Sequence, residues 1–236
     1  MVALYDDILA ARRRRHKLLA LLIDPDKTDP FRAFPYINGQ VDYIFAGGST
    51  GIISPDFIGN IRSLTDLPVV LFPGSPAQYT PEADAMLFLT PMNARDPKWL
   101  IDQQVAAAPL IDADRISIVP TAYLLIDGGR MSTTQRIMQA EPLPRTDTVR
   151  IQAYAKAAGL MGKSLLYLEA GSGAAIPVPA AAIRAAADVF SGALIAGGGI
   201  RTPEAMMQAF EAGADLVVIG NHFEDDPASL TRFTHP

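Results

Sequence analysis

Eight short apolar segments recur along the chain, and they limit its possible folds more than any other feature. They lie at residues 18–23, 43–46, 69–72, 86–89, 116–119, 165–168, 193–196 and 216–219. Their apolar residues are largely continuous rather than alternating, which is typical of strands covered on both faces of a parallel sheet. Helical segments lie between most of them, and two begin with the capping pairs Ser54-Pro55 and Thr202-Pro203. Eight strand–helix units in 236 residues predict the α/β class and a single (β/α)8 TIM-barrel domain over residues 1–236.

Two intervals depart from this regular pattern and predict a modified barrel. Residues 73–85 contain Pro73, Gly74, Pro76 and Pro81, so we expect the crossover helix after the third strand to be missing or replaced. Residues 120–145 are long for a connection, and we expect an insertion or lid there. The stretch 123–129 ends in Asp-Gly-Gly, which is typical of a hairpin turn.

The composition excludes several classes of protein. A net charge of −5 argues against a nucleic-acid binder, and the absence of cysteine excludes disulfides and thiolate metal sites. No apolar run approaches about 20 residues, so we expect no membrane span. The absence of cysteine fits a reducing compartment, so we expect a cytoplasmic protein. We read the basic run at residues 12–17 as a solvated helix end. Trp99, the single tryptophan, is expected in the core or in a subunit interface, and it favours a homo-oligomer.

Glycine-rich loops follow the last two predicted strands, where barrels usually hold phosphate. Gly197, Gly198 and Gly199 precede the Thr202 cap, and Gly220-Asn221 follows the eighth strand. Such loops let backbone N–H groups approach an anion, and a helix N-terminus behind them adds a favourable dipole. Plain tight turns are the alternative interpretation.

Carboxylates also lie at predicted strand ends. Asp24 and Asp26 follow the first strand, and their oxygens suit either Mg²⁺ or helix capping. Ser49 is either a turn hydroxyl or a second metal or phosphate contact. Glu169 ends the sixth strand beside a glycine-rich loop, where a carboxylate can hydrogen-bond a substrate hydroxyl or take its proton. Tyr167 lies two residues earlier, on the same side of the strand.

These segments resemble one known family in their order along the chain. Leu-Ile-Asp-Pro-Asp-Lys at 22–27, Gly-Gly-Ser-Thr at 47–50, Tyr-Leu-Glu-Ala-Gly-Ser-Gly at 167–173, Gly-Gly-Gly-Ile-Arg at 197–201 and Gly-Asn at 220–221 are similar to geranylgeranylglyceryl phosphate synthases of bacteria and archaea. The resemblance implies a Mg²⁺-dependent prenyltransferase that joins sn-glycerol 1-phosphate to a polyprenyl diphosphate through an ether bond. A barrel modified after the third strand also fits this family.

The resemblance also implies roles for particular residues. Asp24 and Ser49 would contact Mg²⁺, and Asp24 and Glu169 would be the catalytic pair. The expected glycerol phosphate contacts are Tyr167, Leu168, Glu169, Ala170, Gly171, Ser172, Gly173, Gly197, Gly198, Gly220 and Asn221. The long loop at 167–173 favours geranylgeranyl over heptaprenyl diphosphate. Leu22 stands where some bacterial relatives have a phosphate-binding lysine.

The prenyl chain requires an apolar groove, for which residues 73–79, 88–92 and 123–125 are candidate walls. An amphiphilic product also favours association with a membrane surface. Two other functions remain open from the residues alone: a phosphate-binding barrel isomerase or lyase, and a non-catalytic phosphometabolite-binding module. A long apolar groove leading from the site would distinguish the prenyltransferase from the isomerase or lyase, because fold alone does not decide function.

Overall fold

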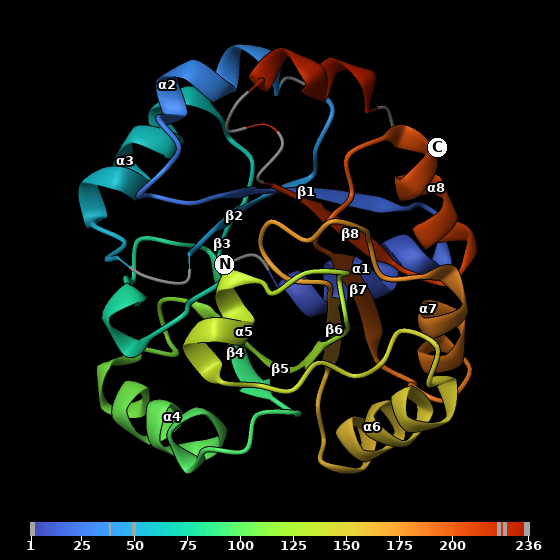
Figure 1. Ribbon diagram of the computed structural model, residues 1–236. Coiled ribbons are helices and arrows are strands. Elements are labelled where there is room, and N and C mark those ends of the chain that lie inside the picture. The colour runs from blue at the N-terminus through green and yellow to red at the C-terminus, as the bar shows by residue number, and fades with distance from the viewer. Residues whose placement is uncertain (1–2, 38, 49–50, 221–222, 224–225, 234–236) are drawn as a thin grey trace.

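The eight predicted strands form one closed parallel barrel in the computed structural model, which describes residues 3–37, 39–48, 51–220, 223 and 226–233 (Figure 1). The strands are β1 (Leu18–Ile23), β2 (Tyr43–Ala46), β3 (Val69–Leu71), β4 (Ala85–Pro91), β5 (Ser117–Leu125), β6 (Leu165–Glu169), β7 (Ala193–Gly197) and β8 (Leu216–Ile219). Each strand pairs with the next along the chain, and β8 returns to pair with β1. The predicted barrel is therefore confirmed.

The α-helices lie outside the strands: most form a ring around the barrel, whereas α1 lies at one end of it and α5 at the other (Figure 1). They are α1 (Leu4–Arg13), α2 (Pro30–Ala33), α3 (Pro55–Leu64), α4 (Gln103–Ala107), α5 (Thr133–Met138), α6 (Thr148–Leu160), α7 (Ala180–Ala187) and α8 (Pro203–Glu211). The predicted caps are present: the Ser54 hydroxyl accepts from the Phe57 N–H, and the Thr202 hydroxyl accepts from the Ala205 N–H. A π-helix, η3 (Lys98–Asp102), precedes α4, and the 3₁₀ helix η4 (Ala108–Leu110) follows it. Two further 3₁₀ helices are η1 (Phe34–Tyr36) and η5 (Pro227–Arg232).

Apolar side chains form two cores because successive strand residues point to opposite faces. One core fills the barrel and contains Ala20, Phe45 and Leu165, whereas the other lies between the barrel and the helices. Helix α1 contributes Leu4 and Ile8, both fully buried, to the inner core. It therefore closes the end of the barrel at which the strands begin.

Polar contacts hold α1 at that end. The Arg12 guanidinium donates to both carboxylate oxygens of Asp215, at 2.8 and 2.5 Å. Lys17 Nζ donates to the Ala214 carbonyl at 2.8 Å. Residues 13–16 are exposed, as predicted for a solvated helix end, but the half-buried Arg12 and Lys17 at the two ends of the basic run bind the barrel.

The two irregular intervals differ in outcome. After β3 the structure has only the 3₁₀ helix η2 (Pro76–Gln78), which confirms that the crossover helix is replaced. The hairpin predicted at residues 123–129 is wrong, because β5 continues to Leu125 and pairs in parallel with β6. The Asp-Gly-Gly signal forms a tight turn, with the Gly129 N–H on Asp127 Oδ1 at 2.9 Å. The chain then runs into an insertion that carries α5 before α6 begins.

No helix in the part of the chain that the structure describes is both long enough and apolar enough to cross a membrane.

Candidate active site

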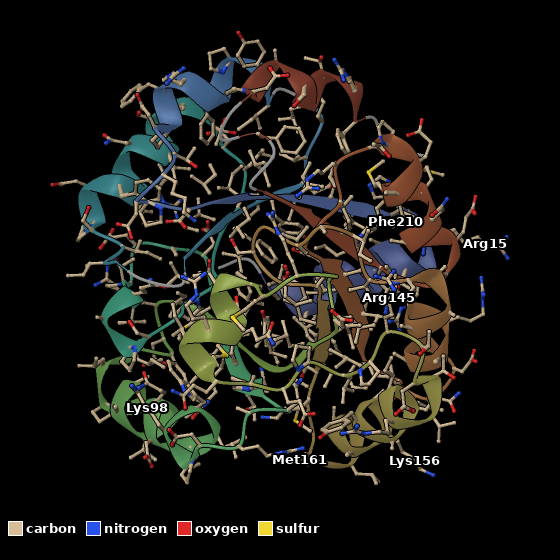
Figure 2. All side chains as sticks on the ribbon, in the orientation of Figure 1. Arg15, Lys98, Arg145, Lys156, Met161 and Phe210 are labelled. Carbon is tan, nitrogen blue, oxygen red and sulfur yellow. The ribbon has the colours of Figure 1, made fainter. Side chains whose placement is uncertain are left out.

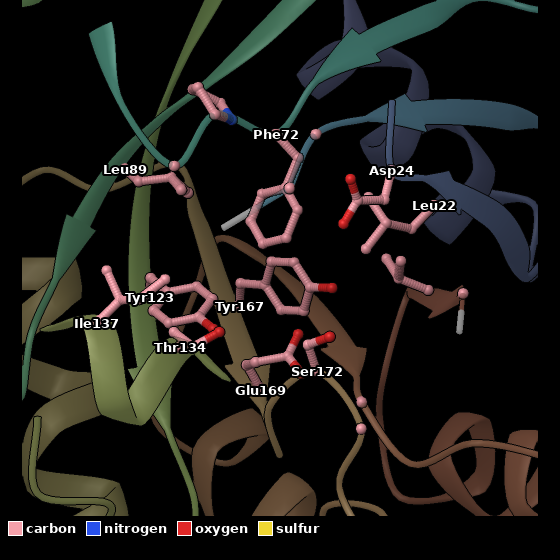
Figure 3. Close-up of a pocket in the computed structure, with 18 of the residues that line it drawn as sticks. Leu22, Asp24, Phe72, Leu89, Tyr123, Thr134, Ile137, Tyr167, Glu169 and Ser172 are labelled. Carbon is pink, nitrogen blue, oxygen red and sulfur yellow. The ribbon is translucent and has the colours of Figure 1, made fainter. Parts of the chain in front are cut away.

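A pocket opens where the strands end, and most of its lining comes from the loops that follow them (Figure 3). The lining residues are Leu22, Asp24, Gly47, Gly48, Phe72, Pro73, Gly74, Leu89, Trp99, Tyr123, Thr134, Ile137, Met138, Tyr167, Glu169, Ser172, Gly173, Gly198, Gly199, Ile200, Arg201, Val218 and Gly220. Figure 3 shows Asp24 near Leu22 and Phe72, and Glu169 beside Ser172. Carboxylates from two separate strand ends thus line one pocket.

Glu169 is a buried carboxyl group, with 5% of its surface exposed. Burial raises its pKa to about 7, while the Gly171 N–H and the nearby Tyr167 hydroxyl act in the opposite direction. The Gly171 N–H donates to Glu169 Oε1 at 2.6 Å, which fixes the carboxylate relative to the loop after β6. This carboxyl can therefore gain or lose a proton near neutral pH.

The glycines after β7 allow its loop to approach the β6 side chains closely. A Cβ atom at Gly197 would collide with the Tyr167 hydroxyl, and one at Gly198 would collide with Glu169 Oε1. Gly198 also has φ of +79°, in the left-handed region that favours glycine. The buried Tyr167 hydroxyl lies close to Glu169 but completes no hydrogen bond of good geometry within the ranges that the structure describes, so it can turn to a ligand.

Three aromatic rings lie together in the pocket, with Tyr167 above Glu169 and Phe72 near Asp24 in the view of Figure 3. The centroid of Phe72 lies 5.0 Å from that of Tyr167 and 6.1 Å from that of Tyr123. Tyr123 meets Tyr167 edge to face at 5.7 Å. Burial raises the pKa of both tyrosines well above the usual value, so both stay neutral. These neutral π-systems can stabilise positive charge above them.

Asp24 is the other carboxylate of the pocket, with 8% of its surface exposed. Its Oδ1 accepts from the Asp26 N–H at 3.0 Å, and its Oδ2 lies 2.7 Å from Lys27 Nζ. Gly48 packs directly against it, since a Cβ atom there would lie 2.7 Å from Oδ1. The carboxylate is thus held between the loop after β1 and the loop after β2.

Whether the region around Asp24 can hold a metal ion depends on the oxygen ligands that it offers. Within the described ranges, no three His, Asp or Glu side chains are close enough together to hold an ion. Mg²⁺ usually keeps several waters and binds through one or two carboxylates together with substrate phosphates. Asp24 therefore fits an ion that arrives with a diphosphate, rather than an ion held by protein alone. Ser49, the other predicted metal contact, lies outside the described residues.

The predicted substrate residues that the structure describes fall into three groups. Tyr167, Glu169, Ser172, Gly173, Gly198 and Gly220 line the pocket together. Leu168 and Ala170 instead pack in the core between barrel and helices, so their side chains point away from the pocket. Gly171 and Gly197 contribute through backbone packing against Glu169 and Tyr167. Asn221 lies outside the described residues.

Several residues that line the pocket were not predicted from the sequence to belong to the site. Thr134, Ile137 and Met138 come from α5, inside the insertion, and Phe72 follows β3. Arg201 belongs to the Gly-Gly-Gly-Ile-Arg segment and donates to the Ala174 carbonyl at 2.8 Å, bracing the loop after β6. The four cations labelled in Figure 2, Arg15, Lys98, Arg145 and Lys156, do not line this pocket.

An apolar groove continues from the pocket over the outer face of β4. Its lining residues are Pro73, Gly74, Ser75, Pro76, Met86, Phe88, Leu89, Pro91, Trp99, Gln103, Gln104, Ala107 and Met138. Met86 belongs to the core outside the barrel, so the groove occupies space that a crossover helix after β3 would fill. Two predicted walls, 73–79 and 88–92, contribute to it, whereas Tyr123 lines the pocket instead.

Trp99 lines both the pocket and the groove, which corrects the expectation that it packs in the core; a place in a subunit interface stays a prediction. The π-helix η3 carries it to this junction, and Lys98 Nζ lies 5.0 Å from its ring centroid. From the sequence, Trp99 could be placed only near the start of a helix. That position does not reveal which cavity its ring faces.

Comparison with known proteins agrees with this geometry. Residues 10–234 match the PcrB family. The chain is 40% identical over 232 residues to geranylgeranylglyceryl phosphate synthase of Flavobacterium johnsoniae, covering 96% of each chain. The corresponding figure for the Korarchaeum cryptofilum enzyme is 37% over 225 residues, covering 93% of this chain and 92% of that one.

Solved structures agree as well. The crystal structure of (S)-3-O-geranylgeranylglyceryl phosphate synthase from Thermoplasma acidophilum, in complex with its substrate sn-glycerol-1-phosphate, superposes with a TM-score of 0.89. It is 34% identical and covers 98% of both chains. With a match over nearly its whole length and relatives of this identity, the chain belongs to the PcrB family.

Proposed function

We propose that the chain is a geranylgeranylglyceryl phosphate synthase, which transfers a geranylgeranyl group to the C3 hydroxyl of sn-glycerol 1-phosphate. One observation carries the proposal: a pocket with two buried carboxylates adjoins an apolar groove, with which it shares Pro73, Leu89 and Trp99. The names of the relatives and the glycerol phosphate in the Thermoplasma acidophilum complex support it.

The groove weighs against the two alternative functions. An isomerase or lyase acting on a small phosphorylated metabolite has no use for an apolar channel on the outer face of β4. A non-catalytic binding module likewise has no need for a buried carboxyl whose pKa is raised to about 7. A substrate with a charged head and a long hydrocarbon tail accounts for both features.

The phosphate of glycerol phosphate belongs at the loops after β7 and β8. Gly198, Gly199 and Gly220 line that side of the pocket, and α8 begins shortly after the first two. Backbone N–H groups beside a helix N-terminus favour an anion. Arg201, on the same side, adds positive charge. The glycerol hydroxyls then face Glu169 and the Tyr167 hydroxyl.

In the transfer step, the bond between C1 of the prenyl chain and the diphosphate oxygen breaks, and its electron pair leaves with the diphosphate. The C3 oxygen of glycerol phosphate forms the new bond to C1, and its proton passes to a Glu169 carboxylate oxygen. The ring faces of Phe72, Tyr123 and Tyr167 stabilise the positive charge that develops on the allylic carbons. Holding both reactants in one pocket removes much of the entropy cost of their encounter.

Asp24 is the residue that would hold Mg²⁺, together with the diphosphate. Bound there, the ion would neutralise the negative charge of the leaving group. Lys27, whose ammonium group contacts Asp24, adds positive charge at the same corner. Leu22 stands where some bacterial relatives have a lysine, so positive charge comes from other residues, among them Lys27, which contacts Asp24, and Arg201, which lines the pocket.

The decisive experiment incubates the purified protein with Mg²⁺, labelled glycerol 1-phosphate and separate prenyl diphosphates of increasing length. We expect a product whose mass corresponds to one geranylgeranyl ether, and a strong preference for glycerol 1-phosphate over glycerol 3-phosphate. Formation of no prenylated product with any chain length would contradict the proposal. A dominant heptaprenyl product would retain the reaction but correct the chain length.

The proposal extends to the setting of the enzyme. We expect a cytoplasmic homo-oligomer that releases its amphiphilic product at a membrane surface. Exposed apolar side chains on one stretch, Ile101, Val105 and Leu110, support a subunit contact there. Sedimentation at micromolar concentration tests the oligomer, and a species with only the monomer mass of 25.3 kDa would contradict it.

A further inference from the structure

The geometry points to Gln78 as a positioning residue that fixes the wall of the pocket where the prenyl diphosphate binds. Gln78 lies in the 3₁₀ helix η2 and has no exposed surface. It touches neither substrate directly, because it does not line the pocket or the groove. The inference rests on the proposed function for the identity of the ligand.

The Gln78 amide joins two loops that are distant in sequence. Its Oε1 accepts from the Gly74 N–H at 2.7 Å, in the connection that follows β3. Its Nε2 donates to the Gly48 carbonyl at 3.1 Å and to the Gly51 carbonyl at 3.4 Å, in the loop after β2. An amide matches this set because it offers an acceptor and two donors from one planar group.

Both loops form the part of the pocket next to Asp24. Gly48 and Gly74 line the pocket, and Gly48 packs against the Asp24 carboxylate. Gly51 packs in the same way against Asp26. Gln78 is therefore separated from the Asp24 carboxylate by a single layer of backbone, and a shift of that backbone changes the space around Asp24.

The same amide also fixes the entrance to the groove. Pro73 and Gly74 line both the pocket and the groove, and Pro76 of η2 lines the groove. A crossover helix would normally pack this connection against the barrel, but η2 is only one turn long. The buried Gln78 amide replaces part of that packing with hydrogen bonds to the backbone.

This placement predicts an effect on one substrate and not on the other. The head of the diphosphate and the start of its tail lie along the loops that Gln78 joins. The hydrogen bonds of Gln78 to Gly74, Gly48 and Gly51 all reach the loops after β2 and β3, whereas the proposed glycerol phosphate site lies at the loops after β7 and β8. Loss of the amide should therefore weaken prenyl diphosphate binding selectively.

The test measures binding of each substrate separately in Gln78→Met, which keeps the length of the side chain but removes the amide. Trp99 is the single tryptophan and lies at the junction of pocket and groove, so its fluorescence reports geranylgeranyl diphosphate binding. Calorimetry reports sn-glycerol 1-phosphate binding. We expect the Kd of the diphosphate to rise about tenfold, which corresponds to a loss of about 1.4 kcal/mol of binding free energy. The Kd of glycerol 1-phosphate should change less than about twofold.

Asp84→Ala serves as the matched control, because Asp84 lies at the other end of the same connection. Its carboxylate accepts from the Val69 N–H at 2.8 Å and pairs with Arg62 at 3.1 Å, away from the pocket. We expect it to lower the melting temperature and leave both Kd values unchanged. Gln78→Asn retains the amide on a shorter side chain and should fall between Met and wild type, which keeps the test usable if the Met variant does not fold.

Equal weakening of both substrates in a folded Gln78 variant, or unchanged diphosphate binding, would overturn the positioning role. Wild-type protein that binds both ligands but yields no ether product would instead contradict the proposed function. Binding of each substrate to the Gln78 and Asp84 variants can be measured whether or not an ether product forms. Failure of the positioning role and failure of the proposed function are therefore distinguishable.

Discussion

Glu169 is the residue at which proton chemistry and substrate binding can be separated. Glu169→Gln keeps the size of the side chain and can still accept from the Gly171 N–H, but it cannot take a proton. We expect kcat to fall about 10²–10⁴-fold, the usual contribution of general acid–base assistance. The Kd of glycerol 1-phosphate should change little, because its phosphate anchor is untouched. Steady-state kinetics and calorimetry provide the comparison, and a rise in KM alone would make Glu169 only a binding residue.

The same carboxyl should also lower the stability of the protein as pH rises. Its folded-state pKa of about 7 lies above the unfolded value of 4.5, so between these values the folded state binds more protons. Stability is lost as pH rises through this window, by about 3 kcal/mol for a shift of this size. At pH 8 we expect Glu169→Gln to melt at a higher temperature than wild type. At pH 5 most of that difference should disappear; an equal difference at both pH values would contradict the shifted pKa.

Asp24 is the described carboxylate that fits a metal-bound diphosphate. Asp24→Asn should leave the fold intact and nearly abolish turnover, because the amide removes the charge that holds the ion. Asp26→Asn is a suitable control, since Asp26 is exposed and does not line the pocket. Rates measured over a range of Mg²⁺ concentrations test the difference. A near wild-type rate for Asp24→Asn at limiting Mg²⁺ would exclude the metal role.

At the scale of elements, the close approach of the β6 and β7 loops depends on Gly198. Gly198→Ala adds a left-handed strain of about 1–2 kcal/mol and also places a methyl group against Glu169 Oε1. Gly39→Ala isolates the strain, because Gly39 has φ of +80° with open space around it. We expect both variants to lose similar stability but only Gly198→Ala to lose kcat/KM, by tenfold or more. Similar kcat/KM values in the two variants would show that the loops after β6 and β7 can move apart without loss of activity.

The strands were predictable because each is covered on both faces, which leaves a continuous apolar run in the sequence. The hairpin error arose where a local turn signal, Asp127-Gly128-Gly129, follows a strand that tertiary pairing with β6 extends to Leu125. The loop residues after β1, β6 and β7 were identifiable because chemistry concentrates at strand ends in barrels.

The rest of the site depends on tertiary packing that no local pattern encodes. Trp99 reaches the groove only because a π-helix and a missing crossover helix leave space beside β4. The residues of α5 come from an insertion whose path the sequence does not specify. Gln78 is polar and sits among prolines, so its full burial has no signature in the chain.

For the whole molecule, the two ends of the barrel have separate roles. The end at which the strands begin is closed by α1, and Arg12 anchors that helix to the buried Asp215. We expect Arg12→Met to cost about 2 kcal/mol, because a buried carboxylate loses its charged partner. Turnover by the folded protein should be unchanged, since the pocket lies at the opposite end.

Arg13→Met is the control for this change, because Arg13 is exposed on the same helix. Chemical denaturation and kcat/KM together provide the measurement. A loss of kcat/KM in Arg12→Met that exceeds the fraction of unfolded protein would contradict this separation, because it would mean that the position of α1 affects the pocket.

The short strand β3 has a consequence for how the barrel fluctuates. It pairs with β4 only at Val70–Ala85 and Leu71–Met86, and no crossover helix covers that side. A seam held by few backbone hydrogen bonds opens locally at a lower free energy than longer pairings, so we expect hydrogen exchange to begin at this seam of the ring. The seam borders the groove on β4. Its opening would let the channel widen for a bulky hydrocarbon while the pairings among β5 to β8, the strands that carry Glu169 and the phosphate loops, stay intact.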